Sequence, residues 1–232
     1  MLKNLLLLFI PIWVIAYATR KQLVRYFGDL LTRAKSTEVS IYDYSLGSKG
    51  QMKQHINTYF NESGRVIYLE VDDNLSNDFK RVFYSFDRSG VMLHQEVKDR
   101  FSTLTKMLVE QDGAGFHYQV YQDGTLLPEL YRVQERGRHT YAQQGEQEAY
   151  QEERNRYGQP LHILTPCAEG MQVEEYKYKQ KREVSYKQIN PHQAPILYQY
   201  KYEEVDHKGN WTTRICYREG EPYEWQIRRI NY

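Results

Sequence analysis

Few residues of this chain are spaced for covalent chemistry. His162 lies five residues before Cys167 in the run HILTPCAEG, a combination that could pair a thiol nucleophile with a base. A catalytic cysteine also needs its base adjacent in space and an oxyanion hole, and nothing in the surrounding sequence indicates either. We therefore expect a protein that is not an enzyme and identify no catalytic residue.

Metal and cofactor chemistry have equally weak candidates. Asp72, Asp73 and Asp78 form a carboxylate cluster in DDNLSND, but their spacing fits no known calcium loop and indicates a solvated turn. Gly113 and Gly115 follow a helical pattern, whereas the glycines of a phosphate-binding loop precede a helix. We expect no metal and no cofactor.

The two cysteines, Cys167 and Cys216, are suited to a disulfide if the protein is exported. Two inert, buried thiols are the alternative. The chain has no C-x-x-C motif and no Cys–His cluster at ligand spacing, which argues against a zinc site.

The most distinctive short run is VDHKGNWTTR, residues 205–214. It joins two strand-like runs, so Gly209 and Asn210 can take the positive φ of a tight turn while Asp206 accepts backbone N–H bonds. Trp211 begins the second run and can pack across the hairpin. We interpret these four residues as a structural turn. The alternative makes Trp211 an exposed anchor for a partner.

These turn residues resemble a known pattern, the tyrosine–aspartate (YD) repeats of RHS-type bacterial surface and toxin-shell proteins. Those repeats have the form Tyr-x-[Tyr/Phe]-Asp-x-x-Gly-Asn. The matching residues are Tyr84, Phe86, Asp87 and Gly90 in one copy, which lacks the Asn, and Asp206, Gly209 and Asn210 in the second half of another. The resemblance implies β-hairpins and a bacterial cell-envelope or secreted setting. It carries over no catalytic residues, because these repeats are structural.

The N-terminus has the clearest targeting signal. Lys3 precedes an apolar run from Leu5 to Ala18, whose length suits a signal-peptide core better than a membrane span. Residues 16–18 have the small-x-small form of a cleavage site. We expect residues 1–18 to be a signal peptide and the protein to be periplasmic or secreted.

The basic residues that follow favour an alternative. Arg20, Lys21 and Arg25 disfavour export and could hold an uncleaved inner-membrane anchor with its C-terminal side in the cytoplasm. A buried helix is the third interpretation of the run. Residues 19–36 have apolar positions on one helical face and predict an amphipathic helix.

Residues 37–136 read as an α+β domain. Alternation predicts strands at 37–44, 65–71 and 80–87, whereas apolar residues on one helical face predict helices at 49–60 and 96–110. Two further strands flank the Asp123-Gly124 turn. This βαββαβ-like order contains that of ferredoxin-like folds, and another helix-backed antiparallel sheet is equally admissible.

Residues 137–232 have no helical pattern from Pro160 onward. Partly alternating runs, separated by turn signals, predict an antiparallel β-meander rich in Tyr and Lys/Arg. The chain has 22 Tyr, a residue that suits half-buried sheet surfaces with a polar tip at the water.

These features lead to a functional prediction. The balance of 31 basic and 30 acidic residues argues against a nucleic-acid partner. We expect a non-catalytic exported bacterial protein that binds another protein, in one version an immunity or accessory protein of a toxin system. The alternatives are a structural component of cell-envelope assembly and an envelope hydrolase with an unrecognised site.

Overall fold

The computed structural model describes residues 34–45, 47–113 and 115–232. Within these residues every regular element is a β-strand, and none is a helix long and apolar enough to cross a membrane. The predicted signal peptide at residues 1–18 lies outside the described residues, as does nearly all of the predicted helix at 19–36.

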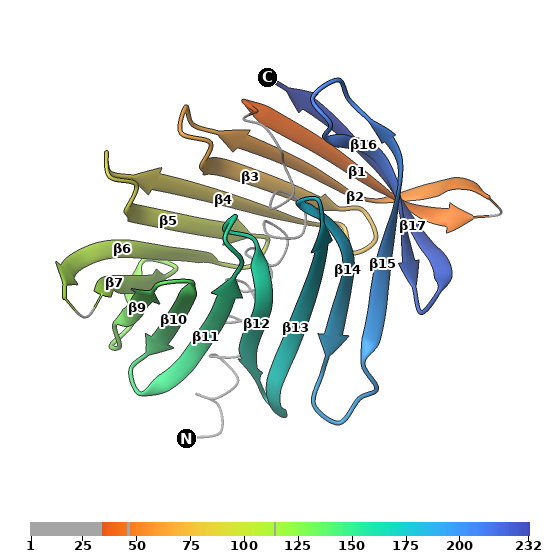
Figure 1. Cartoon of the computed structure of the whole chain (residues 1–232). Helices are drawn as coiled ribbons and strands as arrows, with labels where there is room; N and C mark the ends of the chain where they lie inside the picture. Colours follow the sequence, from red (N-terminus) through yellow and green to blue (C-terminus); the bar gives the residue numbers. More distant parts are fainter. Residues whose placement is uncertain (1–33, 46, 114) are drawn as a thin grey trace.

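The described strands follow one another along the chain with short connections (Figure 1). They are β1 (Ser36–Ser45), β2 (Ser48–Phe60), β3 (Val66–Asp73), β4 (Asp78–Phe86), β5 (Met92–Asp99), β6 (Thr103–Asp112), β7 (Gly115–Gln122), β8 (Thr125–Leu126), β9 (Tyr131–Arg136), β10 (His139–Gln144), β11 (Gln147–Arg154), β12 (Pro160–Cys167), β13 (Gly170–Lys179), β14 (Arg182–Ile189), β15 (Ile196–Val205), β16 (Trp211–Arg218) and β17 (Glu221–Asn231).

Sixteen of these strands close into one antiparallel barrel. Each strand pairs with its neighbours in sequence, except that β7 pairs with β9 past the two-residue β8. The ring closes because β1 pairs with β17 on one side and with β2 on the other. In Figure 1 the orange and blue ends of the chain therefore lie side by side.

The predicted α+β class is wrong, because both predicted helices are strands. Residues 49–60 belong to β2, in which Gln54, Ile56 and Thr58 alternate with outward-facing residues. Residues 96–110 are divided between β5 and β6. The same sheet also runs through the predicted boundary at residue 136, because β9 pairs with β10. The predicted strands at 37–44, 65–71 and 80–87 are found as β1, β3 and β4, and the predicted β-meander at 137–232 is also found as strands.

The barrel has two open ends, which we name by where the chain enters. The entry end is where β1 begins and β17 ends, and Lys35 N–H donates to the carbonyl of Asn231 there at 2.7 Å. Because the strands alternate in direction, the connections after β2, β4, β6, β9, β11, β13 and β15 also lie at this end. The remaining connections lie at the far end.

Four turns at the entry end share one geometry. Each begins with Asn61, Asp87, Asn155 or Asp206, and the side-chain Oδ1 of that residue accepts the backbone N–H four residues later. The backbone N–H of the same residue donates to the carbonyl four residues later. The fourth position is always Gly, with φ between 79° and 91°. Both aspartates of the YD resemblance belong to this set.

The interior is filled in two different ways. The aliphatic core lies mainly on β1–β7 and consists of Val39, Ile41, Ile56, Leu69, Val71, Val82, Val97, Leu104, Val120 and Trp211. The tyrosine core lies on β10–β16 and consists of Ala142, Ala149, Tyr150, Ile163, Tyr176, Tyr186, Tyr200 and Cys216. Strand alternation places both sets inside the barrel.

The outer face carries charges in the middle of strands. Glu70 on β3 and Arg81 on β4 face outward at 2.9 Å, next to the inward-facing Leu69 and Val82. On the opposite wall, Glu175 and Lys187 pair across β13 and β14 at 3.8 Å. Charged side chains therefore lie on the outside of both halves.

Candidate ligand-binding cavity

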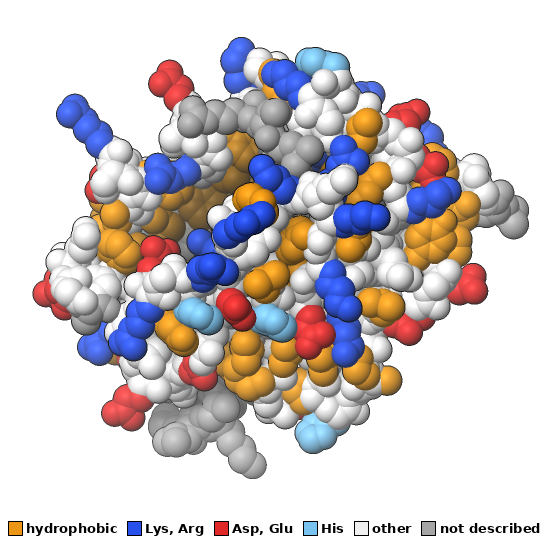
Figure 2. Space-filling model, viewed as in Figure 1, with side chains coloured by type: hydrophobic (Ala, Val, Ile, Leu, Met, Phe, Trp, Pro, Cys, Tyr) orange, Lys and Arg blue, Asp and Glu red, His pale blue; other side chains and the backbone are white. Residues whose placement is uncertain are grey.

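A cavity of about 610 Å³ opens inside the barrel toward its entry end. Figure 2 shows a hollow with hydrophobic side chains inside it near the entry-end tips of β3 and β4. The cavity is lined by Arg65 and Val66 where β3 begins, by residues of β4, β5, β6, β7, β9, β10 and β11, and by the turn from Asp87 to Val91. It thus lies at the seam between the aliphatic core and the tyrosine core.

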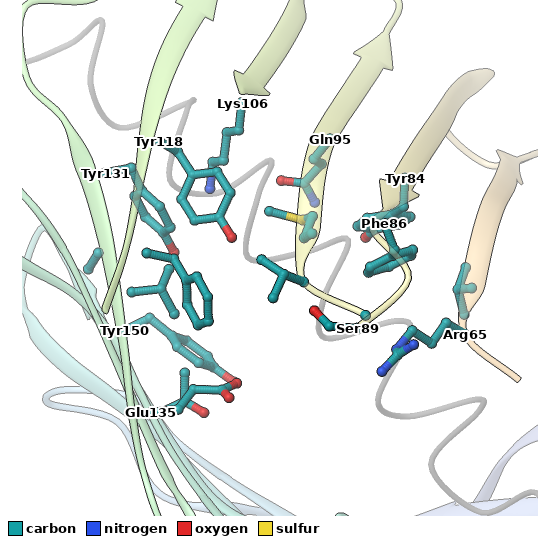
Figure 3. Close-up of a pocket in the computed structure, with 18 residues that line it drawn as sticks. Arg65, Tyr84, Phe86, Ser89, Gln95, Lys106, Tyr118, Tyr131, Glu135 and Tyr150 are labelled. Atoms are coloured by element: carbon teal, nitrogen blue, oxygen red, sulfur yellow. The ribbon is translucent and has the colours of Figure 1, made fainter. Parts of the chain in front are cut away.

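Aromatic rings form two facing walls of this cavity (Figure 3). Tyr84 and Phe86 alternate on β4 and stack with their ring centroids 6.2 Å apart. Across the cavity, Tyr118 and Tyr131 pair at 6.4 Å between β7 and β9. Tyr150 on β11 continues this second wall. A flat or apolar ligand between the walls would contact ring faces and edges on both sides.

One buried cation lies on the cavity wall. Lys106 on β6 points inward, and its Nζ lies 3.6 Å from the centroid of the Tyr131 ring. An ammonium group over an aromatic face is stabilised by the ring quadrupole. Gln95 on β5 is paired with Lys106 and also lines the cavity. The Lys106 ammonium and the Gln95 amide therefore form a polar region on the wall of a largely aromatic cavity.

Tyr118 provides a hydroxyl donor in the same cavity. Burial, together with the nearby Tyr131 and Glu135, raises the pKa of Tyr118 to about 12. The side chain is therefore neutral and keeps its proton across the physiological pH range. Its hydroxyl can donate to an acceptor on a ligand.

The mouth of the cavity depends on a close contact between two turns. A Cβ on Gly90 would lie 1.8 Å from the guanidinium of Arg65, so this side chain would have to move to make room for it. Gly90 also has φ 91°, which L side chains rarely adopt. The Arg65 guanidinium lies 5.8 Å from the centroid of the Phe86 ring. Arg65 thus lies across the tip of the β4–β5 hairpin at the entrance.

The tyrosine core contains a hydrogen-bond network around a buried carboxylate. Glu174 accepts hydrogen bonds from Tyr176 at 2.6 Å, Tyr186 at 3.1 Å and Gln172 at 3.2 Å. Burial, followed by the charge of Glu174, raises the pKa of Tyr176 well above 10. Tyr176 therefore remains a donor, and the network joins side chains of β13 and β14 inside the barrel.

A second network surrounds Trp211. The guanidinium groups of Arg228 and Arg214 lie 3.9 and 4.2 Å from the Trp211 ring, and Arg228 Nε donates to the Trp211 carbonyl at 2.9 Å. Arg214 donates to Gln226 at 2.7 Å. Trp211 has no exposed surface. The structure therefore places it inside the barrel, which argues against its role as an exposed anchor.

The remaining residues of the predicted turn lie at the barrel rim. Asp206 accepts N–H bonds from Lys208 and Asn210, each at 2.9 Å, and its carboxylate also accepts the hydroxyl of Tyr232. Asn210 donates to the same hydroxyl at 2.7 Å. Gly209 has φ 80°. None of the four predicted turn residues lines the cavity.

No disulfide joins the two cysteines in the structure. Cys167 is exposed at the far-end tip of β12, whereas Cys216 is buried in β16. Three strands, β13, β14 and β15, lie between them around the barrel wall, so the possible disulfide suggested by the sequence is not formed.

The weaker candidates for chemistry do not assemble into a site. His162 and Cys167 lie on the same strand, roughly 16 Å apart at about 3.3 Å per residue. Asp73 is paired with Asp78 at the β3–β4 turn, and its Oδ1 accepts the N–H groups of Leu75 and Ser76. Among the described residues, no three His, Cys, Asp or Glu side chains are grouped so that they could hold a metal ion.

Most residues of the cavity were not identified from the sequence as a site. Tyr84, Phe86 and Gly90 belong to the YD resemblance, and Lys106 lies within a predicted helix. The available signal was the alternation of aromatic residues in FYSF and FHYQVY. This alternation indicates two cavity walls only when both segments are known to face the same side of a closed barrel.

Comparisons with known proteins show fold similarity at a low level. No protein-family model matches the chain, and no curated protein is similar to it. One solved structure, described as a porin-like protein from Bacteroides uniformis ATCC 8492, is similar over 85% of this chain and 96% of its own, with 8% sequence identity and a TM-score of 0.49. Values this low carry no conclusion about function or location.

Proposed function

We propose that this barrel is a non-catalytic binding protein that holds a small ligand with a flat aromatic or apolar body in the entry-end cavity. The observation that carries the proposal is the cavity itself. Its volume of about 610 Å³ falls within the range of small-molecule sites, which form preferentially in the mouths of barrels. Facing aromatic walls supply the apolar contacts, and Lys106, Gln95 and Tyr118 supply a few polar ones.

The charged outer face supports a barrel wall surrounded by water. Charges near the middle of a lipid-facing wall are destabilising. Glu70, Arg81, Glu175 and Lys187 occupy such positions here. Export, a protein partner and a role in envelope assembly stay predictions.

A fluorescence titration tests ligand binding. N-phenyl-1-naphthylamine is a neutral aromatic probe that becomes bright in apolar surroundings. We expect saturable binding of one probe per chain, and at least a tenfold weaker affinity for Met92→Trp, because Met92 lines the cavity and a larger ring would fill it.

The matched control is Leu93→Trp, one residue further along β5. Leu93 is 41% exposed and does not line the cavity, so the same added volume should leave the affinity unchanged. Equal affinities for both variants, or the absence of saturable binding to the unmodified protein, would contradict the proposal.

A further inference from the structure

The two ends of the barrel carry opposite charge. The entry-end connections, with the adjacent residues 34–35 and 232, contain seven Lys or Arg and three Asp or Glu. The described far-end connections contain one Arg and five Asp or Glu. The balance is thus four positive charges at the entry end and four negative charges at the far end. The basic residues of the entry end are Lys35, Arg65, Arg88, Arg138, Arg156, Lys181 and Lys208. Figure 2 shows Lys and Arg gathered around the hollow at this end.

Three neighbouring entry-end hairpins are tied together sideways. Gln159 in the β11–β12 turn donates from Nε2 to the carbonyl of Lys181 at 2.7 Å. Arg182 at the start of β14 donates to the carbonyl of Gly209 in the β15–β16 turn at 2.6 Å. These hydrogen bonds hold the three basic turns in one surface. The turns therefore need not become ordered before their positive charges can act together.

An exposed aromatic ring lies within this surface. Tyr157 is 50% exposed, and both Arg156 and Lys181 lie 4.8 Å from its ring centroid. Tyrosine beside lysine and arginine is the composition found at the boundary between a bilayer and water, where the ring sits among headgroups and the cations reach lipid phosphates.

The N-terminal sequence connects to the same end. The apolar run from Leu5 to Ala18 and the basic Arg20, Lys21 and Arg25 precede β1 in the chain. The first described residues, Ala34 and Lys35, lie at the entry end. The described chain thus begins at the end of the barrel that carries the positive charge.

We infer that the entry end docks on the surface of a bilayer containing anionic phospholipids. Each Lys or Arg held near such a surface adds attraction, which falls off within a Debye length. The acidic far end would be repelled and would face away. This inference concerns the charged rim and does not depend on a ligand in the cavity.

Vesicle co-flotation of the full chain tests the inference. The probes are vesicles of phosphatidylcholine alone and vesicles with 30% phosphatidylglycerol. The measured quantity is the difference in binding between the two. The phosphatidylcholine arm accounts for any binding through the apolar N-terminal run. We expect the anionic vesicles to bind at least tenfold more strongly at 50 mM salt, and the difference to disappear by 500 mM.

Two triple variants give the decisive comparison. The entry-end variant combines Arg156→Glu, Lys181→Glu and Lys208→Glu, and the far-end control combines Lys49→Glu, Arg100→Glu and Arg218→Glu. Both change the net charge by the same amount, and all six residues are exposed. We expect only the entry-end variant to lose the preference for anionic vesicles, while it keeps its melting temperature and its binding of N-phenyl-1-naphthylamine.

Three outcomes would overturn the inference. Equal loss in both triple variants would mean that net charge alone matters. Loss of binding in Phe101→Ser, a far-end residue that is 82% exposed, would reverse the orientation. Tighter binding to soluble polyglutamate than to vesicles of equal total charge would identify the rim as a site for an acidic protein.

Discussion

The two halves of the barrel interior are filled by side chains of different chemistry. In the aliphatic core, Val, Ile and Leu fill the space without hydrogen bonds from their side chains. In the tyrosine core, each large inward ring carries a hydroxyl that must find a partner, and buried carboxylates such as Glu174 provide it. Because the cavity lies where the two cores meet, we infer that it arises from incomplete packing between two different sets of side chains.

The largest expected effect comes from Trp211, the one large ring of the aliphatic core. Truncating a packed Trp costs about 3–5 kcal/mol, so Trp211→Ala should lower the melting temperature strongly or abolish soluble expression. Gly209→Val should also destabilise, since a β-branched residue resists the φ of 80° at Gly209. Thermal melts of both variants check this. A Trp211→Ala protein with unchanged melting would contradict the packing.

The tyrosine core should instead be sensitive to loss of an acceptor. Glu174→Leu leaves the buried hydroxyls of Tyr176 and Tyr186 without that acceptor, at a cost of about 1–3 kcal/mol for a donor left unsatisfied. Adding Tyr176→Phe and Tyr186→Phe should recover at least half of the loss.

Urea unfolding measures this series. The control is Glu175→Leu, the outward-facing neighbour, which should change the free energy of unfolding by less than about 0.5 kcal/mol. If Glu174→Leu were as harmless as Glu175→Leu, the two cores would not differ in the way described.

Raising the pH should weaken the tyrosine core without any change in the volume of its side chains. The pKa of Tyr176 is raised in the folded state, so the folded protein keeps this proton where an unfolded tyrosine, with a pKa of 10, releases it. The stability contributed is therefore present below pH 10 and is lost as the pH rises above it. Tyr176→Phe should show a smaller loss of melting temperature between pH 9 and pH 11 than the unmodified protein. Equal losses would mean that Tyr176 does not contribute.

The smallest effect is expected at the rim, outside both cores. The pKa of Asp206 is lowered in the folded state: burial opposes the shift, but hydrogen bonds from Tyr232, Asn210 and Lys208 outweigh it. Its contribution is present above the ordinary pKa of 3.8 and is lost as the pH falls below that value. Asn61 and Asn155 form the same turn, so Asp206→Asn should fold normally at pH 7 and lose less melting temperature than the unmodified protein from pH 6 to pH 3. A larger loss would contradict this.

Local patterns predicted the strands well and the helices badly, for an identifiable reason. Val97 and Leu104 are seven residues apart, a spacing typical of one helical face. In the barrel they face each other as a directly paired couple across the β5–β6 hairpin, whose turn contains Phe101. A short hairpin thus reproduces helical spacing, and only the pairing partner distinguishes the two.

The residues of the cavity could not be predicted as a site from neighbouring residues in the sequence, for a different reason. Tyr84, Lys106, Tyr131 and Tyr150 come from four strands separated by other elements, and nothing in their immediate neighbours marks them as a group. Their proximity depends on how the barrel curves, which depends on all of the pairings. By contrast, Asp206, Gly209 and Asn210 could be placed in a turn, because a turn is set by adjacent residues.

The pairing of β1 with β17 has a consequence for how the chain folds. Among the pairings that form the wall, it alone joins distant parts of the chain, since Ser36 pairs with Asn231 while the others join neighbouring segments. Hairpins can form one after another during synthesis, but the open sheet keeps two unpaired edges until residues 221–231 have left the ribosome. Such edges invite association with other chains. Closure is therefore a late, slow step of high contact order, and chaperone binding before it is complete would protect the nascent barrel.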